Sequence, residues 1–527
     1  MLGIGGLMVL LSAFAIVFGI LNAKISAEAS QGFSANLRRA LFDKIEHFSF
    51  SNIDHFSSAS LITRMTNDTN QMQGTLMMSM RMLTRAPIML VSALVIAVSI
   101  NLRLSSVIFG AIIVLVIAVP FIMRKAGLLF SEMQQRLDAL NGTVRENLIG
   151  IRVVKAFVRE GYERTKFGKS NDDLMASAVK AGNLVAVTMP LMMLVLNATT
   201  IAVIWLGGNF VGTGDMTTGA LMSFISYIMQ ILMSVMIFAM VFVMLTRARA
   251  CAQRILEVLD TATDVRDDAK ALPSGDMPKV TQGGVEFRDV SFRYSAGGGD
   301  VLSGVSFKAE PGALVGIVGG TGSGKTTLVS LIPRFYDASQ GEILVDGVNV
   351  RDYVQEDLRA GIGMVMQQNN LFSGTIRDNL LWGNPDAGTD DIVGAAKDAQ
   401  AHNFIESFPD GYETELGQGG VNVSGGQKQR LCIARAMLKK PSILILDDST
   451  SAVDTATEAL IRRSFTKNFK DCTVIVVAQR ISSVQEADKI IVLDDGVVAG
   501  IGTHDELLEN NEIYREICIS QSEGVKH

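Results

Sequence analysis

Long apolar runs with few charges dominate the first half of the chain. Five of these runs approach the roughly 20 residues that a helix needs to cross a bilayer. They occupy residues 2–21, 86–100, 104–123, 187–211 and 218–245. Buried helices of a large soluble core would be another explanation, but five such runs favour a membrane-spanning region. The first run is not typical of a signal peptide, because no basic residue precedes it and its helical pattern continues to about residue 50.

The basic residues between the runs predict the orientation of this region. Segments 23–85 and 124–186 carry 7 and 11 Lys or Arg, whereas the short loops 101–103 and 207–217 carry only Arg103. Cytoplasmic loops are enriched in Lys and Arg, so we expect both long segments in the cytoplasm. Five crossings then place the second half of the chain there as well. An odd number suggests that a sixth span precedes residue 1, although a five-span subunit would satisfy the same charge rule.

Both long segments are polar, have a helical pattern and are too long to be simple turns. We expect each to consist of two spans extended inward as long helices and joined by a short crossing helix. The tips are expected near residues 51–56 and 157–162, where each offers an aromatic side chain and charges. Such a tip would suit a contact with a partner domain, or would equally suit a solvated loop apex.

The pattern changes after the last apolar run. Residues 251–283 become charged and then rich in residues typical of a linker. From about Gly284 onward, short apolar strands alternate with helices, which indicates an α/β domain. We therefore predict an α-helical transmembrane domain in residues 1–250, a linker, and an α/β domain in residues 284–527.

Composition agrees with this division. Of the 527 residues, 48% are hydrophobic, and the formal net charge is −6. That value conceals a basic half and an acidic half, because residues 1–250 carry a net charge of +8 and the remainder carries −14. The basic residues are dispersed between apolar runs, so we expect no nucleic-acid partner. The four cysteines are spread too widely to predict a metal site or a disulfide framework.

The most specific motif is a glycine-rich stretch that matches the phosphate-loop pattern G-x-x-x-x-G-K-[ST]. It lies between an apolar run, residues 314–318, and a helical run, residues 327–332, so strand, loop and helix follow in the required order. In such a loop the backbone N–H groups face an anion, Lys325 reaches the terminal phosphates, and the Thr326 hydroxyl can ligate magnesium. The residues expected to bind ATP here are Gly319, Gly320, Thr321, Gly322, Ser323, Gly324, Lys325, Thr326 and Thr327.

Three further features belong with this loop. The apolar strand 443–446 ends in Asp447, which places a carboxylate beside the magnesium ion of a phosphate-loop site. Tyr294 ends another strand pattern, where it could stack on adenine or could equally be a structural strand residue. Ser424, Gly425, Gly426 and Gln427 open a helix and form a second anion site. One chain with two phosphate-binding helix ends is best explained if the second serves ATP bound to another chain.

Together these residues identify a resemblance to the ATP-binding cassette transporters, specifically to half-transporters of the exporter type, over nearly the whole chain. The resemblance implies that Tyr294 stacks on adenine and that Gln367 contacts magnesium and senses the membrane domain. It implies that Ser424 to Gln427 are the signature, which contacts the ATP of a second half-transporter. Two nucleotide domains would close around two ATP molecules, and the closure would flip the membrane spans from inward to outward facing.

Two positions depart from the family pattern. Asp448 stands where a glutamate usually polarises the attacking water, and Gln479 stands where a histidine is usual. The shorter side chain withdraws the carboxylate, and glutamine cannot carry a titrating proton. We expect a site that holds ATP but hydrolyses it slowly, in a heterodimer with a dissimilar partner. A homodimer in which Asp448 suffices and an ATP-gated regulatory or channel-like membrane protein are the alternatives.

The transported molecule is less well defined. Five methionines lie along the last span at helical spacing: Met229, Met233, Met236, Met240 and Met244. Flexible, polarisable side chains suit a cavity that accepts varied apolar molecules, although such stripes commonly pack against helices or lipid. Few charges lie within the spans, so we expect a hydrophobic drug, lipid or peptide substrate and not a small ion. The expected location is the bacterial plasma membrane.

Overall fold

The computed structural model describes residues 2–267, 276–294, 297–449 and 452–523. The chain forms two compact units. The first, the membrane unit, comprises Met1–Glu46 and Ala59–Thr261, and the second, the nucleotide unit, comprises His47–Ser58 and Ala262–His527. A short segment from the first half of the chain is therefore part of the nucleotide unit. Residues 268–275 of the expected linker lie outside the described residues.

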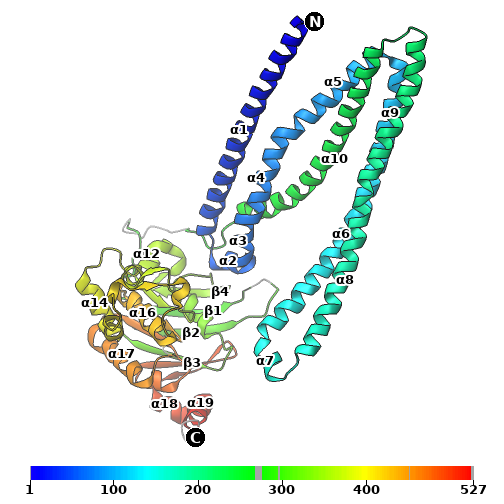
Figure 1. Cartoon of the computed structure of the whole chain (residues 1–527). Coiled ribbons are helices and arrows are strands. Elements are labelled where there is room, and N and C mark those ends of the chain that lie inside the picture. The colour runs from blue at the N-terminus through cyan, green and yellow to red at the C-terminus, as the bar shows by residue number, and fades with distance from the viewer. Residues whose placement is uncertain (1, 268–275, 295–296, 450–451, 524–527) are drawn as a thin grey trace. The chain divides into compact units, whose positions relative to one another are not determined.

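The membrane unit is helical throughout (Figure 1). In chain order it contains α1 (Leu2–Glu46), α3 (Ser58–Thr63), the π-helical turn η1 (Arg64–Asp68), α4 (Thr69–Met78), the π-helical turn η2 (Ser79–Leu83), α5 (Arg85–Ile100), α6 (Leu102–Ile149), α7 (Ile151–Ala156), α8 (Glu160–Ala186), α9 (Thr188–Gly212) and α10 (Thr218–Asp260). Within the described residues, five helical stretches are long and apolar enough to cross a membrane, which confirms the predicted helical membrane region.

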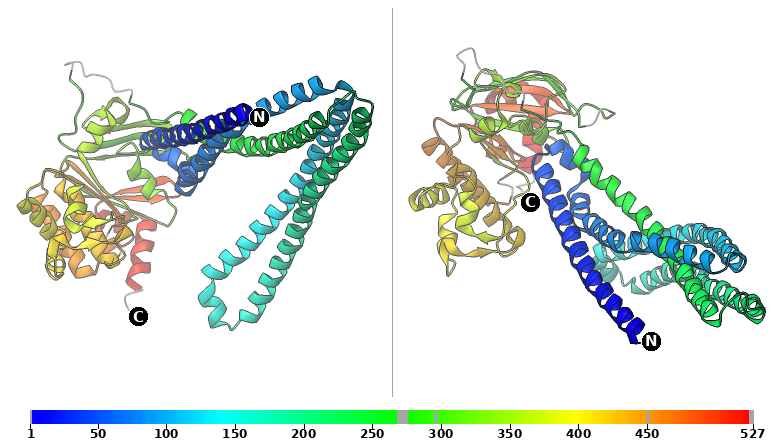
Figure 2. Two further views of the ribbon diagram at one scale, coloured as in Figure 1. Left: turned by 45° about the horizontal axis from the view of Figure 1, so that its top comes forward. Right: turned by 90° about the horizontal axis from the view of Figure 1, so that it is seen from above.

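Helix α6 illustrates how the long helices are built. Asn101 caps its start, where the side-chain oxygen accepts a hydrogen bond from the Leu104 N–H at 3.0 Å. At about 1.5 Å per residue, a helix of this length extends for about 70 Å, more than twice the apolar thickness of a bilayer. A helix of that length would extend beyond the bilayer, and α6 lies beside α8, as both Figure 1 and Figure 2 show.

The tip of this second long segment differs in detail from the expectation. The short helix α7 ends at Ala156, before the expected residues 157–162, and α8 already begins at Glu160. Val158 adopts a left-handed backbone with φ of 52° in the bend between them. At the other end of the unit, helix α10 continues past the expected domain boundary to Asp260. The alternation of apolar and polar residues in these segments has a helical period on both sides of each bend, so it could not locate the bends.

The nucleotide unit contains two main sheets. An antiparallel sheet has the strand order β2-β1-β4-β5, and a six-stranded sheet has the order β12-β11-β3-β10-β9-β6. The strands are β1 (Val285–Phe292), β2 (Leu302–Ala309), β3 (Leu314–Gly319), β4 (Gln340–Val345), β5 (Val348–Asn349), β6 (Ile362–Val365), β9 (Ile443–Asp447), β10 (Thr473–Val477), β11 (Lys489–Asp494) and β12 (Val497–Gly502). The two-residue strands β7 (Gly374–Thr375) and β8 (Glu415–Leu416) form a separate pair.

Helices cover these sheets, and the described α-helices of the unit are α2 (Phe50–Phe56), α11 (Lys325–Ser330), α12 (Gln355–Ala360), α13 (Ile376–Leu381), α14 (Thr389–Asp398), α15 (His402–Glu406), α16 (Gly425–Leu438), α17 (Thr455–Asn468), α18 (His504–Asn510) and α19 (Glu512–Glu523). Strands β6, β9, β10, β3 and β11 run parallel, as the predicted α/β fold requires. Their side chains are buried on both faces, which explains the continuous apolar runs in the sequence.

The register of the parallel strands positions the site. On β10, Val477 lies opposite Asp447 of β9 and opposite Ile317 of β3. The carboxyl ends of parallel strands meet at one edge of a sheet, where ligands of α/β proteins commonly bind. The residues that follow β3, β6, β9 and β10 are therefore brought to the same edge, although they are far apart in the sequence.

Candidate functional site

The phosphate loop connects β3 to α11. Gly324, with φ of 92°, immediately precedes the helix, and a Cβ atom there would lie 2.8 Å from Leu302 Cδ2. Gly319 is tighter, because a Cβ atom on it would lie 2.0 Å from the carbonyl oxygen of Leu493. Only glycine fits these two positions. The loop thus has the tight backbone that the motif predicts.

Lys325 lies across the loop. Its Nζ donates to the carbonyl oxygens of Gly319 at 2.9 Å and Gly320 at 2.6 Å. Burial lowers the pKa of Lys325, whereas the charges of Asp447 and Asp448 act in the opposite direction. The ammonium group is therefore held among two carboxylates and two carbonyl dipoles, at the place where the motif would put the terminal phosphates of a nucleotide.

Asp447 ends β9 and is 1% exposed. Its Oδ1 accepts a hydrogen bond from Thr326 Oγ1 at 3.1 Å. Burial raises the pKa of Asp447, and the hydrogen bond from Thr326 opposes that rise. A hydroxyl and a carboxylate oxygen side by side are the hard ligands that Mg²⁺ prefers. In the part of the chain that the structure describes, no group of three or more His, Cys, Asp or Glu could hold a metal by itself. This donor set fits an ion held largely by substrate phosphates.

Asp448 and Gln479 meet at the same edge of the sheet. Gln479 Nε2 donates to Asp448 Oδ2 at 2.7 Å. Asp448 has a left-handed backbone with φ of 49°, and its N–H donates to the carbonyl of Val477 at 3.0 Å. Burial raises the pKa of Asp448, while a hydrogen bond from Gln367 lowers it. The two unusual residues are thus hydrogen-bonded to each other, and the side-chain amides of Gln479 and Gln367 hold the Asp448 carboxylate in place.

One pocket contains most of the expected nucleotide residues. It is lined by Val301, Gly319, Gly320, Thr321, Gly322, Ser323, Gly324, Lys325, Thr326, Thr327, Gln367, Asp447, Asp448, Val477, Gln479, Glu516, Ile517, Ser520 and Gln521. Val301 and the four residues of α19 were not predicted from the sequence to lie here. The apolar spacing of α19 indicates only a packed face, and no local signal places that helix beside a loop almost 200 residues earlier in the chain.

Tyr294 lies beside this pocket without lining it. Its hydroxyl is 2.9 Å from Thr327 Oγ1, and its ring makes an edge contact with Tyr336 at 5.3 Å between centroids. The side chain is 50% exposed. An accessible ring tethered to the end of the phosphate loop is compatible with the expected stacking on adenine.

The residues of the expected signature are elsewhere. Ser424 caps α16, where its Oγ accepts from the Gln427 N–H at 3.3 Å and Gln427 Oε1 accepts from the Ser424 N–H at 2.8 Å. A Cβ atom on Gly426 would lie 2.8 Å from the Ala452 carbonyl oxygen, and Gly425 precedes it in the first turn. None of these four residues lines the described pocket. The structure therefore does not bring them into this chain's own nucleotide site.

Helix α2 packs against another segment of the nucleotide unit, residues 333–338, which we call the docking loop. Phe50 stacks on Phe335 with ring centroids 4.2 Å apart, and the Tyr336 hydroxyl donates to Asp54 Oδ2 at 2.6 Å. The expected tip near residues 51–56 is therefore part of an ordered interface within this unit. The aromatic and acidic residues of the tip were visible in the sequence, whereas their partners in the docking loop were not.

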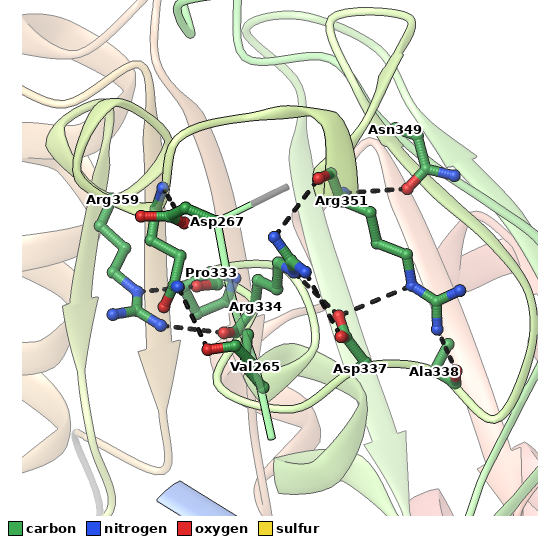
Figure 3. Close-up of polar contacts among 10 residues, drawn as sticks. Val265, Asp267, Pro333, Arg334, Asp337, Ala338, Asn349, Arg351 and Arg359 are labelled. Carbon is green, nitrogen blue, oxygen red and sulfur yellow. Dashed lines mark hydrogen bonds and ion pairs between the residues drawn. The ribbon is translucent and has the colours of Figure 1, made fainter. Parts of the chain in front are cut away.

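Arginine side chains hold the docking loop in place. Arg334 and Arg351 both point toward Asp337, at 2.8 and 3.6 Å (Figure 3). Arg334 is 3% exposed and has a left-handed backbone. Arg359 donates to the carbonyl oxygens of Pro333 and Arg334, at 3.1 and 2.9 Å. These contacts fix the backbone on both sides of Phe335 and Tyr336. The rings of these two residues are thereby held against α2.

Comparisons with known proteins agree with this geometry. Residues 1–235 match the family model described as "ABC transporter transmembrane region", and residues 302–451 match the model described as "ABC transporter". The chain is 41% identical over 517 residues to an uncharacterized ABC transporter ATP-binding protein, YfiB, of Bacillus subtilis, covering 98% of this chain and 89% of that protein. It is 36% identical over 481 residues to a fatty acid ABC transporter ATP-binding/permease protein of Mycobacterium bovis, covering 91% and 75%.

A solved structure is similar as well. It is the structure of a bacterial Atm1-family ABC exporter with ATP bound, with a TM-score of 0.80 and 28% sequence identity, covering 96% of this chain and 88% of that one. Both halves of the chain are thus matched in order, and the apolar helices precede a cytoplasmic nucleotide-binding domain. The protein belongs to the ATP-binding cassette transporters and is a membrane-spanning half-transporter of the exporter type.

Proposed function

We propose that this half-transporter pairs with a second, dissimilar half-transporter, and that its own site holds ATP but hydrolyses it slowly. The observation that carries the proposal is the hydrogen bond of 2.7 Å between Gln479 Nε2 and Asp448 Oδ2. The Asp448 side chain is one methylene shorter than that of glutamate. Its carboxylate is hydrogen-bonded to the Gln479 amide, which cannot accept a proton. Displacements near 1 Å can cost about a hundredfold in rate, so this pair is poorly suited to activating water.

The remaining site residues are assigned to ATP binding. Residues Gly319 to Thr327 would bind the phosphates, with the Lys325 ammonium group as the positive charge nearest to them, and Tyr294 would stack on adenine. Thr326, Gln367 and Asp447 would hold Mg²⁺, which supplies positive charge to the phosphates when it is bound. The hydrogen bond of Thr326 to Asp447 and the pocket that these two residues share with Lys325 and Gln367 support the phosphate and Mg²⁺ roles. The contact of the Tyr294 hydroxyl with Thr327 supports the adenine role.

The signature would serve the other chain. Ser424 caps the start of α16, where its Oγ accepts a hydrogen bond from the Gln427 N–H. None of the signature residues lines the described pocket. A helix start of this kind favours an anion. In a pair of half-transporters it would contact the ATP of the partner, so this chain would complete a site where the partner supplies the glutamate and the histidine.

Export of a hydrophobic or amphipathic molecule is the transport activity we infer. The relative that is named a fatty acid transporter supports an amphipathic substrate. On α10, Met229, Met233 and Met240 are exposed in the single chain, which is compatible with a flexible apolar lining. Alternating access driven by ATP binding and hydrolysis would move the substrate out of the cell.

Purified full-length protein reconstituted in nanodiscs tests the proposal. We expect retained binding of Mg²⁺-ATP with turnover well below that of a mixture with the correct partner. Lys325→Ala is the control that should remove ATP binding. Brisk hydrolysis by the protein alone would contradict the slow site and favour a homodimer in which Asp448 suffices. ATP-gated current without accumulation of substrate in inside-out vesicles would favour a channel-like protein instead.

A further inference from the structure

The last described helix, α19, lies beside the nucleotide pocket. Glu516, Ile517, Ser520 and Gln521 line this pocket together with the phosphate loop. The helix is firmly attached, because Tyr514 is fully buried and its hydroxyl is 2.8 Å from Nδ1 of His504 in α18. Figure 1 shows α18 and α19 next to each other, near the end of the chain. An anchored helix in this place can influence residues that face the nucleotide.

Gln521 contacts the backbone of the segment that carries Gln479. Its Nε2 donates to the Gln479 carbonyl oxygen at 2.7 Å, and its Oε1 accepts from the Ile481 N–H at 2.9 Å. A glutamine amide has one donor end and one acceptor end, and here each end has a backbone partner. The two bonds flank Arg480, so they fix the backbone on both sides of that residue.

The same segment reaches the site through the Gln479 side chain, whose Nε2 donates to Asp448 Oδ2 at 2.7 Å. The hydrogen bonds therefore form a continuous series from α19 to the end of β9. We propose that Gln521 is a positioning residue that holds Gln479 where it can contact the terminal phosphate of bound ATP. This inference rests on the proposed function of the pocket as an ATP site.

A purely structural role for Gln521 makes a different prediction. If the side chain only filled space between α19 and the segment 479–481, a residue of equal size would replace it. Gln521→Met has nearly the same size and carries no charge, so it adds no repulsion between this position of the pocket and the phosphates. It has no donor for the Gln479 carbonyl oxygen. The positioning role requires the donor, so the two roles diverge for this variant.

Equilibrium binding of AMPPNP and ADP to the full-length protein in nanodiscs tests the inference without depending on hydrolysis. Only AMPPNP carries a terminal group at the γ position. We expect Gln521→Ala to weaken AMPPNP binding by about threefold to tenfold, the range for loss of the single hydrogen bond from Gln479 to the γ-phosphate group, and to leave ADP binding unchanged. Gln521→Met should weaken AMPPNP binding about as much. Gln485→Ala, which removes the same side chain from an exposed position nearby, should change neither.

A double-mutant cycle with Gln479 completes the test. If Gln521 acts through Gln479, adding Gln521→Ala to Gln479→Ala should change AMPPNP binding by less than about twofold. Equal losses for AMPPNP and ADP, a Gln521→Met protein that binds like the unsubstituted one, or additive losses in the double variant would each overturn the inference alone. Failure of the unsubstituted protein to bind either nucleotide would instead contradict the proposed ATP site, and the inference with it.

Discussion

At the scale of single residues, the proposed slow hydrolysis would follow from the side-chain length at position 448. Asp448→Glu would extend the carboxylate by one methylene toward the place where an attacking water would lie. Because misplacement near 1 Å can cost about a hundredfold, we expect turnover to rise by roughly tenfold or more with little change in KM for ATP. Steady-state phosphate release by the full-length protein measures this. Unchanged or lower turnover would show that length at this position is not what limits the rate.

The backbone at Gly319 makes a second residue-scale prediction. A Cβ atom there would lie 2.0 Å from the Leu493 carbonyl oxygen, so β3 and β11 would have to separate. We expect Gly319→Ala to destabilise the nucleotide unit by about 1 to 3 kcal/mol, seen as a lower unfolding midpoint without nucleotide. Gly320→Ala is the matched control, because nothing lies within 4 Å of its Cβ position. Equal effects on the two midpoints would contradict the steric argument.

At the scale of elements, helix α2 and the docking loop offer a test of communication along the chain. Tyr336 donates to Asp54 at 2.6 Å, and burial together with this carboxylate raises the pKa of Tyr336. Tyr336→Phe removes the hydrogen bond and keeps the ring. Since α2 is continuous in sequence with long helices on both sides, we expect ATP binding to persist while stimulation of ATPase activity by transported substrate falls about twofold to tenfold.

A matched variant separates this effect from general destabilisation. Tyr353 is fully buried and donates to the carbonyl oxygen of Val345 in β4 at 2.8 Å. Tyr353→Phe makes the same chemical change, so it should cost about 1 kcal/mol of stability without altering substrate stimulation. If both variants lose stimulation equally, the bond between Tyr336 and Asp54 has no special part in coupling.

These elements also show what sequence could and could not predict. The loop 319–326 was recognisable because its glycines, Lys325 and both flanking elements are local in sequence, and Asp447 because it ends an apolar strand. The docking loop and α19 were not, since their contacts join residues about 280 and 40 positions apart through the tertiary fold. No periodic pattern in the sequence indicates the pairing of Tyr336 with Asp54 or that of Gln521 with Gln479.

At the scale of the whole molecule, segment 47–58 belongs to the nucleotide unit although the helices before and after it belong to the membrane unit. Its attachment is extensive: Asn52 Nδ2 donates to the Ala262 carbonyl oxygen at 3.3 Å, and Ser51 Oγ donates to Asp264 Oδ2 at 2.8 Å. The chain thus enters the nucleotide unit at His47 and leaves it at Ser58, between two long helical segments of the membrane unit.

The division of labour between two half-transporters makes the last prediction. If the signature serves the partner's hydrolytic site, Ser424→Ala in this chain should lower turnover of the mixed assembly by at least about tenfold, as loss of one donor to a reacting phosphate does. Lys325→Ala would affect only this chain's own slow site, so it should lower turnover less. In a homodimer each substitution would fall in both sites, and both variants would lose nearly all activity.

The comparison needs a control, because Ser424 also caps α16 and loss of a cap costs about 1 kcal/mol. Thr503 caps α18 in the same way, accepting from the Glu506 N–H at 3.4 Å. Thr503→Ala should therefore reproduce the loss of stability without the loss of turnover. A mixed assembly in which Lys325→Ala is as damaging as Ser424→Ala would show that this chain's own site hydrolyses ATP at a rate that matters. The pair would then be symmetric in function despite Asp448 and Gln479.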